Sequence, residues 1–463
     1  MKMQPSSSEG RVRLSRGTGG KVSPARRAAF DILRRVEETD AYASVLLATS
    51  TDDLRPEDRG LCYELVLGVL RRQMWLDRII EHYALRSADK LDTPVRLALR
   101  LGLYQLRFLA RVPASAAVNE SVNLAYEAKT GSAAALINAV LRRATREPDY
   151  DPSADIVDPV EKLAVETSHP AWMIRRWIKQ FGEDEARQLA GANNRTAPVA
   201  FRVNTLRANA DDVTDRLRAA GDLIEPSSLV PGAWRMISGS SQSLRQLARE
   251  GLIYPQDEAS QLVAHAVGAR PGERVLDLCA APGSKTTHIA MLAQDQALMV
   301  AGDIHKHRLR VVGELAVRQG LASIRLIQFN AAEALPFADG LFDRVLVDAP
   351  CTGTGTLRHN PEIRWRIRAE NIAQSAAGQQ QILRCATRMV RPGGRLVYST
   401  CSVEREENED VVAALLEDHT AFKQVPVAAT SSLPQQTAPV AVRTWPHRDD
   451  VSGFFIATFI CRN

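Results

Sequence analysis

Apolar positions between residues 23 and 145 recur at the spacing of α-helices. A Ser-Pro pair at residues 23–24 is a typical helix start, and three apolar side chains then fall on one face: Phe30, Leu33 and Val36. Further amphipathic stretches follow over residues 61–69, 95–109, 118–128 and 137–141. The sequence of this region shows no strand-like alternation. The pattern predicts an all-helical domain over residues 22–145.

From residue 256 onward, short apolar runs alternate with stretches of helical periodicity. Six runs have the length and composition of buried strands: RVLDLC, LMVAGD, SIRLIQ, DRVLVD, GRLVYS and GFFIATFI. Strands that alternate with helices imply a parallel sheet, because the helical crossovers cover both of its faces. Ligands bind at the carboxyl ends of the strands in such sheets. We therefore expect an α/β domain over residues 256–463 with its site at this edge.

Three other segments complete the organisation of the chain. Residues 1–21 contain five Lys/Arg, one Glu and almost no large apolar side chain, which predicts a disordered basic arm. Residues 146–165 are rich in Asp and Pro and are interpreted as a linker. Residues 166–255 mix short helices with strand-like pieces such as FRVNT (201–205), and they predict a small α/β module.

Composition and charge exclude several classes of protein. The 463 residues are 45% hydrophobic, and no apolar run approaches the roughly 18 residues of a membrane span. The start of the chain lacks the apolar segment of a secretory signal, so we expect a cytoplasmic protein with no membrane partner. The net charge of +5, with basic residues bunched in the arm, is consistent with an RNA partner. A solvated tail would have the same composition.

Most cysteines, histidines and acidic runs have an ordinary explanation. The six cysteines are scattered without the paired spacings of zinc sites or disulfide frameworks, and three are interpreted as inert core residues: Cys62, Cys385 and Cys461. The histidines at 288, 305, 307, 359 and 447 lack ligand-like spacing, so we expect no metal. The run EREENE (404–409) is interpreted as the solvated start of a helix, where acidic side chains are favoured.

The first strand of the α/β domain leads into DLCAAPGSKTTH (277–288), a Pro/Gly turn that opens a helix. Its small residues let a ligand lie against the backbone, and the helix start offers free amide donors. The loop matches neither GxGxxG nor GxxxxGK[ST], which disfavours NAD and ATP. A zwitterionic adenosyl ligand without phosphates fits better. Asp303 ends the second strand, where a carboxylate can accept the ribose hydroxyls, although acids there are more often turn or cap residues.

Two cysteines and an aspartate follow later strands at the same predicted edge. Asp348 and Cys351 lie in VDAPCTGTGTLRHNPEIRW (347–365), and Cys401 lies in YSTCSVEREENE (398–409). Both cysteines stand beside Pro, Gly, Ser or Thr rather than within an apolar stripe. This setting favours accessible, reactive thiols.

This combination fits the methylation of carbon 5 of a cytosine. That carbon is too electron-poor to attack a methyl sulfonium unaided, so a thiolate must first add to carbon 6. The addition places negative charge on N3, and the carboxylic group of Asp348, held against N3 and the 4-amino group, can stabilise it. After methyl transfer the carbon 5 proton must leave, and a second cysteine can assist its release. The residues alone do not distinguish the roles of the two thiols.

The motifs resemble those of the Nop/Sun family of RNA cytosine-5 methyltransferases. In chain order they are YPQDEAS (254–260), CAAPGSKT (279–286), AGDIHKHR (301–308), DAPCTGTG (348–355), STCSV (399–403) and HRDDVSGFF (447–455). The segments VNESVNLAYEAKTG (118–131) and INAVLRRA (137–144) resemble the all-helical, RNA-binding NusB fold. With a NusB-like domain in front, the chain is most similar to the branch of the family that methylates bacterial small-subunit (16S) rRNA.

The resemblance implies a multidomain protein with an all-α NusB-like domain, a small α/β RNA-binding module and a Rossmann-like methyltransferase domain built on a mostly parallel seven-stranded sheet. It implies S-adenosyl-L-methionine as cofactor, a covalent bond at Cys401, release assisted by Cys351, and Asp348 at the junction of cofactor and base. The other implied cofactor contacts are Cys279, Ala280, Ala281, Pro282, Gly283, Ser284, Lys285, Asp303 and Asn330. The implied RNA contacts in the small module are Arg202 and Asn204.

Two positions depart from the family's usual pattern. Ser284 replaces a usual Gly, and Asn330 replaces an Asp that receives the adenine amino group, so this contact lacks charge assistance. Two alternatives stay open: a cytosine-5 methyltransferase of tRNA or of several RNAs, and a non-catalytic NusB-like RNA-binding or antitermination factor. The intact cysteine pair and cofactor loop argue against the second. We expect a monomer whose partner is 16S rRNA.

Overall fold

The computed structural model describes residues 20–239, 241–427 and 440–462. The predicted basic arm therefore lies almost wholly outside the described residues. The chain divides into two compact units. The first runs to Asp151, apart from Tyr42–Leu46 and Leu70–Trp75, which belong to the second unit together with everything from Pro152 onward.

The N-terminal region is helical throughout its regular elements, as its periodicity predicts. Its helices are α1 (Pro24–Glu38), α2 (Ala43–Ser50), α3 (Pro56–Arg71), α4 (Gln73–Ala84), α5 (Thr93–Phe108), α6 (Ala114–Glu127) and α7 (Ala134–Arg146), with short 3₁₀ turns at Ala88–Lys90 and Gly131–Ala133. Helix α1 starts at the predicted proline and buries the predicted apolar face. Gly102 lets α5 approach α7 closely, because a Cβ there would lie 2.6 Å from Leu141 Cδ1.

The second half of the predicted linker is a helix rather than a loop. Helix α8 (Pro159–Thr167) begins after Asp158, whose side chain accepts a hydrogen bond from Glu161 N at 2.8 Å. The Asp-Pro pair is thus a cap followed by a first-turn proline, which is a helix start signal. Helices α8, α9 (Ala171–Phe181) and α10 (Glu183–Ala192) share a core with apolar side chains of the α/β domain, including Leu357 and Trp445.

The C-terminal part of the second unit is built on an eight-stranded sheet. Seven strands lie in the order β10-β12-β9-β8-β5-β6-β7, and β11 pairs with β12. Their bounds are β5 (Arg274–Asp277), β6 (Leu298–Asp303), β7 (Ile324–Gln328), β8 (Phe342–Asp348), β9 (Val390–Thr400), β10 (Phe422–Val425), β11 (Ala441–Arg443) and β12 (Phe455–Cys461). Strands β9, β8, β5, β6 and β7 are parallel, whereas β12 is antiparallel to β9, β10 and β11. The mostly parallel sheet is confirmed, with β11 as an additional strand.

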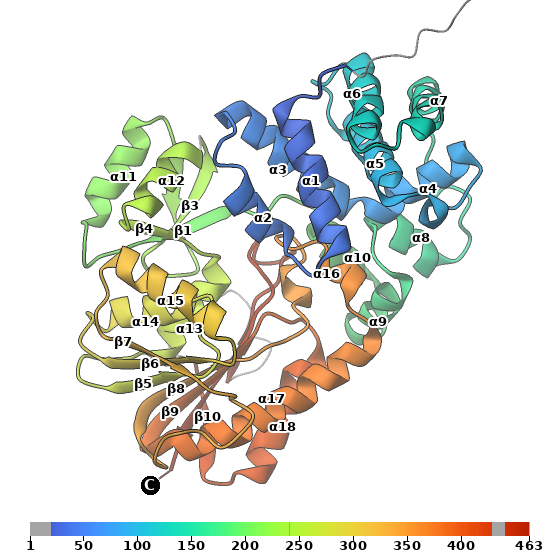
Figure 1. Cartoon of the computed structure of the whole chain (residues 1–463). Helices are drawn as coiled ribbons and strands as arrows, with labels where there is room; N and C mark the ends of the chain where they lie inside the picture. Colours follow the sequence, from blue (N-terminus) through green and yellow to red (C-terminus); the bar gives the residue numbers. More distant parts are fainter. Residues whose placement is uncertain (1–19, 240, 428–439, 463) are drawn as a thin grey trace, which may run out of the picture. The chain divides into compact units, whose positions relative to one another are not determined.

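Helices cover both faces of this sheet (Figure 1). They are α13 (Glu258–Val267), α14 (Ser284–Leu292), α15 (Lys306–Gln319), α17 (Ala369–Met389) and α18 (Glu409–Asp418), with a short α16 (Ile363–Arg366) and 3₁₀ turns at Thr354–Thr356 and Arg405–Glu407. On β8, Val345 and Val347 pack in one core with α17 and α18, whereas Leu346 packs in the other core with α13 and α14. Burial on both faces explains why the central strands read as uninterrupted apolar runs.

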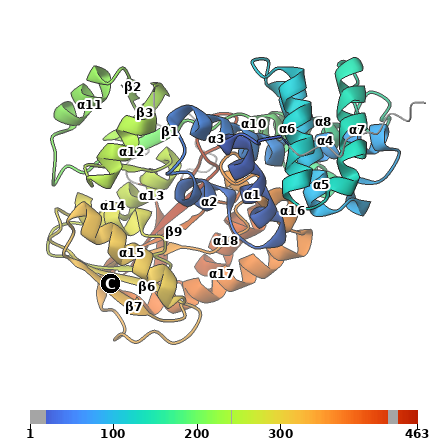
Figure 2. The same cartoon turned by 45° about the horizontal axis from the view of Figure 1, so that its top comes forward.

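The small module contains a separate antiparallel sheet in the order β2-β3-β1-β4. Its elements are β1 (Val199–Val203), α11 (Ala210–Ala219), β2 (Leu223–Pro226), β3 (Ala233–Ser238), α12 (Ser241–Arg249) and β4 (Ile253–Pro255). Phe201, Leu217 and Leu247 contribute to its core. In Figures 1 and 2 this sheet lies beside α14 and α15, the helices that follow β5 and β6.

Candidate active site

The two predicted reactive cysteines meet at the carboxyl edge of the large sheet. Strands β8 and β9 are parallel neighbours, and Asp348 at the end of β8 pairs in register with Ser399 near the end of β9. Cys351 follows in the loop after β8, and Cys401 directly follows β9. Their sulfur atoms lie 3.2 Å apart, and both side chains are partly exposed. Neighbouring parallel strands therefore bring the two thiols together.

Asp348, on the same edge as this pair, contacts a lysine of the first loop. Its Oδ1 accepts a hydrogen bond from Ser399 Oγ at 2.8 Å, and its Oδ2 accepts one from Lys285 Nζ at 2.7 Å. The Nζ atom also lies 5.0 Å from the centre of the Phe454 ring. Burial opposes the charge of Lys285, but Asp348 and, more weakly, Cys401 raise the pKa of its ammonium group above the ordinary value. Lys285, expected only as a cofactor contact, is thus part of the thiol–carboxylate cluster.

The loop between β5 and α14 is fixed at its start by a buried aspartate. Asp277 accepts hydrogen bonds from Thr286 Oγ1 at 2.7 Å and from Cys279 N at 3.3 Å. Burial raises the pKa of Asp277 to about 7, with a smaller upward effect from Asp348. Burial also holds the pKa of the Cys279 thiol well above its ordinary value, so Cys279 serves this loop as a small neutral residue.

The remaining predicted cofactor residues stand on the same edge. Ala280 to Gly283 form the turn, and Ser284 and Lys285 begin α14. Asp303 ends β6 and is buried; its Oδ1 accepts a hydrogen bond from His305 N at 2.9 Å, and its Oδ2 lies 3.6 Å from Arg308 Nη1. Asn330 follows β7, and its Oδ1 accepts a hydrogen bond from Ala332 N at 3.1 Å. Both side chains thus make local turn bonds, which was the alternative interpretation of Asp303.

These residues fit an adenosyl cofactor in their donor chemistry. Strands β5, β6 and β7 are neighbours, so the small-residue turn, Asp303 and Asn330 line one edge. The first amides of α14 can receive an amino-acid carboxylate, and a buried carboxylate at the end of β6 can accept ribose hydroxyls.

The acidic run EREENE is not the solvated helix start that its composition suggested. Helix α18 begins only at Glu409, and both Glu404 and Glu407 are 0% exposed. Glu404 accepts a hydrogen bond from Trp177 Nε1 at 3.1 Å, and Glu407 accepts one from Thr352 N at 2.8 Å. The donors lie far away in the sequence, so a local charge pattern could not reveal them. Glu407 is a site residue that sequence reasoning missed.

The structure places Arg202 and Asn204, the expected RNA contacts, in the interior of the second unit. Both residues are only 1% exposed. Arg202 donates hydrogen bonds to Gln256 Oε1 and to Thr287 Oγ1, each at 3.0 Å, and Asn204 donates one to Gln319 O at 2.8 Å. The bonds to Thr287 and Gln319 join the small module to α14 and α15, and neither Arg202 nor Asn204 lies on the surface.

Three further expectations from the sequence concern metal ligands, membrane spans and the remaining cysteines. Among the described residues, His, Cys, Asp and Glu side chains form no cluster of three or more that could hold a metal ion. The helices of the described ranges include none that is both long and apolar enough to span a membrane. Cys62 is buried, whereas Cys385 and Cys461 are partly exposed, so the interpretation as core residues fits only the first.

Comparison with known families divides the chain in a similar way. Residues 23–146 match the NusB family, residues 169–241 match the ferredoxin-like domain of RsmF/B-like methyltransferases, and residues 264–460 match the family described as 16S rRNA methyltransferase RsmB/F. The chain is 34% identical over 447 residues to a probable ribosomal RNA small subunit methyltransferase B of Bacillus subtilis, covering 95% of this chain and 99% of the relative. It is also 34% identical to the ribosomal RNA small subunit methyltransferase B of Pseudomonas syringae, covering 88% of this chain and 90% of that one.

Solved structures show the same architecture. The crystal structure of PH0851 matches with a TM-score of 0.83 and 28% identity, covering 96% of this chain and all of that one. The structure of NSun6 from Pyrococcus horikoshii with SFG matches with a TM-score of 0.56 and 21% identity over 64% of this chain and 98% of that chain, which supports the fold alone. Because relatives at 34% identity match nearly the full length of both chains, this chain belongs to the ribosomal RNA small subunit methyltransferase B family and is an S-adenosylmethionine-dependent methyltransferase.

Proposed function

We propose that the protein methylates carbon 5 of a cytidine in 16S rRNA through a covalent bond between Cys401 and carbon 6. The observation that carries this proposal is the 3.2 Å separation of the Cys351 and Cys401 sulfur atoms beside the Asp348–Lys285 pair. Methylation at carbon 5 requires a nucleophile at carbon 6 and help for proton release, and two adjacent thiols offer both. The names of the two relatives support ribosomal RNA as the substrate.

Cys401 is the attacking thiol in this proposal. The ammonium group of Lys285 interacts electrostatically with Cys401, and a neighbouring cation stabilises the negative charge of a thiolate. The hydrogen bond with Cys401, burial and the charges of Cys401 and Glu407 hold the pKa of the Cys351 thiol well above its ordinary value. A thiol with a raised pKa is mostly protonated, so Cys351 is not the attacking nucleophile in this proposal.

The base is activated when the Cys401 sulfur bonds to carbon 6 and the ring electrons move to N3. Asp348 and Lys285 lie together where they can receive N3 and the 4-amino group and offset the new negative charge. Bound S-adenosylmethionine supplies an electrophilic methyl group to carbon 5. Loss of the carbon 5 proton then re-forms the double bond between carbons 5 and 6, and the electrons of the sulfur–carbon bond return to Cys401.

The covalent bond at Cys401 changes the surroundings of Cys351 before this last step. The main causes of its raised pKa are the hydrogen bond with Cys401 and burial, followed by the charge of Cys401. Once the Cys401 sulfur is bonded to carbon 6, it can no longer carry that charge. Cys351 can then lose its own proton to solvent more readily, and the resulting thiolate can take the carbon 5 proton, which gives the two thiols successive roles.

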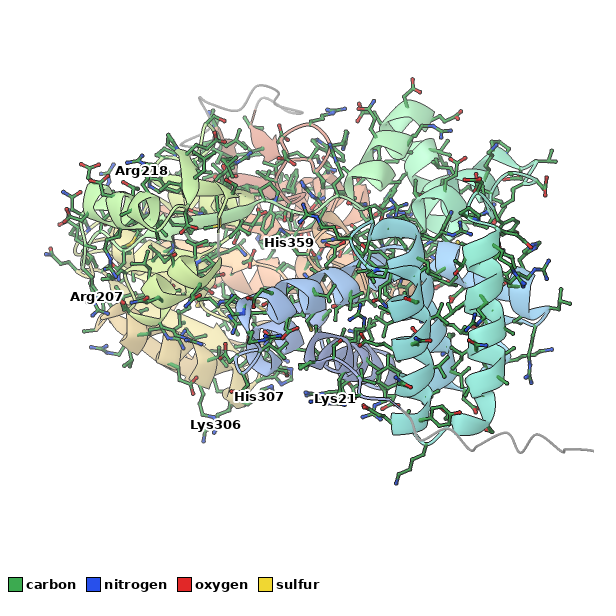
Figure 3. All side chains as sticks on the ribbon, turned by 90° about the horizontal axis from the view of Figure 1, so that it is seen from above. Lys21, Arg207, Arg218, Lys306, His307 and His359 are labelled. Atoms are coloured by element: carbon green, nitrogen blue, oxygen red, sulfur yellow. The ribbon has the colours of Figure 1, made fainter. Side chains whose placement is uncertain are left out.

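Exposed basic side chains of the second unit can contact the RNA backbone. Arg207, in the small module, and Lys306 and His307, at the start of α15, are all exposed. Figure 3 shows Lys306 pointing away from the protein. These residues, rather than the buried Arg202 and Asn204, are our candidates for RNA contact. A 16S rRNA substrate also places the proposed activity in the cytoplasm.

The test uses purified protein, S-adenosylmethionine and total RNA from cells that lack this gene. Bisulfite sequencing should show one newly protected cytidine in 16S rRNA. Cys401→Ala should abolish this signal while retaining cofactor binding, and Cys461→Ala, which changes a partly exposed thiol away from the site, should not. Protection only in tRNA would contradict the substrate, and full activity of Cys401→Ala would contradict the mechanism.

A further inference from the structure

One buried carboxylate contacts the residue that follows each reactive cysteine. Thr352 follows Cys351, and Ser402 follows Cys401. Glu407 Oε2 accepts hydrogen bonds from Thr352 Oγ1 at 2.5 Å and from Ser402 Oγ, and Glu407 Oε1 accepts one from Thr352 N at 2.8 Å. The two segments that carry the thiols are thus tied to a single side chain.

The same network also holds the residue before Cys351. Gln379 Nε2, on α17, donates hydrogen bonds to Glu407 Oε1 at 3.1 Å and to Pro350 O at 2.9 Å. Cys351 is therefore held on both sides, through Pro350 and Thr352. A buried carboxylate is costly unless it is hydrogen-bonded, and Glu407 meets that cost with donors from the loop it holds, from Ser402 and from α17.

Building on the proposed function, we propose that Glu407 is a positioning residue that clamps Cys351 and Cys401 side by side. It touches neither sulfur and acts through Thr352 and Ser402. Two thiols that act in succession on carbons 5 and 6 of one ring must stay in register with each other. A misplacement of about 1 Å can cost roughly 100-fold in rate, so the clamp should set the turnover number and not the affinity for cofactor.

The hydrogen bonds of Glu407 on the Cys401 side and on the Cys351 side, here called the two arms of the clamp, can be removed separately. Ser402→Ala removes the hydrogen bond on the Cys401 side, and Thr352→Val removes the hydroxyl on the Cys351 side but keeps the backbone N–H bond. On RNA that carries 5-fluorocytidine at the target, fluorine replaces the proton that must leave, so the methylated adduct is trapped. Ser402→Ala should slow this trapping about tenfold or more. Thr352→Val should form the trapped adduct on 5-fluorocytidine RNA at the normal rate. On ordinary RNA it should accumulate the covalent adduct, because release is assisted by Cys351.

Substitutions of Glu407 itself test the shared carboxylate. Glu407→Gln can still accept two hydrogen bonds at Oε1 and donate to the two hydroxyl oxygens, so it should lose less activity than Glu407→Ala, which should lose about 100-fold in kcat. Glu417→Gln, which removes the same charge from the exposed part of α18, is the matched control and should behave like the unchanged protein. The KM and Kd for S-adenosylmethionine should stay within twofold in every variant.

The melting temperature and cofactor affinity separate positioning from a general structural role. If Glu407→Ala does not fold, the single-arm variants Ser402→Ala and Thr352→Val decide the question. Normal kcat in both single-arm variants, or activity losses that only parallel losses of cofactor affinity, would overturn the clamp. The unchanged protein and Cys401→Ala are assayed alongside. Failure of the unchanged protein to trap 5-fluorocytidine RNA would instead overturn the proposed function.

Discussion

Replacing Lys285 with methionine would test the electrostatic centre of the site. Methionine keeps most of the apolar stem against Phe454 but removes the ammonium group that lies 2.7 Å from Asp348. The Lys285 and Asp348 side chains are only 12% and 25% exposed, so water replaces this partner poorly. A hydrogen bond between charged groups in such a setting contributes about 2–3 kcal/mol. If that stabilisation is needed when N3 gains charge, kcat should fall about 30- to 150-fold.

The assay is transfer of a labelled methyl group to 16S rRNA under single-turnover conditions, together with calorimetric measurement of S-adenosylmethionine binding. We expect the rate to fall while cofactor affinity changes little, because the structure directs Nζ to Asp348. Lys423→Met, on the exposed edge of the sheet at β10, is the control for loss of one positive charge. A normal rate with weakened cofactor binding would refute this reasoning and return Lys285 to the role of a simple cofactor contact.

Three further predictions concern other parts of the site. Cys351→Ala should accumulate a covalent RNA–protein adduct on a denaturing gel that Cys351→Ala/Cys401→Ala lacks; a clean gel would contradict the release role. Arg202→Met should cost about 2 kcal/mol of stability by leaving buried acceptors unpaired, with RNA affinity unchanged, and reduced RNA affinity at an unchanged melting temperature would contradict this. The raised pKa of Asp277, about 7 against the ordinary 3.8, stabilises the fold below pH 4, and this contribution is lost as pH rises to 7. As pH rises from 4 to 7, the melting temperature of Asp277→Asn should therefore increase relative to that of the unchanged protein, by an amount equivalent to at most about 4 kcal/mol of unfolding free energy. A difference in melting temperature that does not change with pH would contradict this prediction.

The fold class could be predicted because its signals are local. Helical spacing of apolar residues identified the N-terminal helices, and uninterrupted apolar runs identified strands buried on both faces. The helix in the second half of the predicted linker, residues 146–165, also has a local explanation. The Asp158–Pro159 pair is compatible with a loop, but here it caps and starts a helix that packs into a core with Leu357 and Trp445.

Burial by distant elements, by contrast, is not visible in a local pattern. Arg202 lies in a strand between Phe201 and Val203, and such alternation normally places a basic side chain in solvent. Here α14 and α15 cover that face and supply Thr287 and Gln319 as partners of the module. The same holds for the acidic run at 404–409, because Thr352 and Gln379, two of the partners of Glu407, lie more than 25 residues away in the sequence.

The arrangement of charges also explains why two nearly equivalent thiols can have different roles. Parallel pairing of β8 and β9 places the sulfur atoms in contact, so ionising both would put two negative charges 3.2 Å apart. Glu407 accepts a hydrogen bond from Thr352, the residue after Cys351, whereas Lys285 interacts electrostatically with Cys401. Lys285 therefore favours negative charge on the Cys401 side, whereas Glu407 disfavours it at Cys351. Exchanging the positions of Lys285 and Glu407 should therefore exchange the roles of the two thiols.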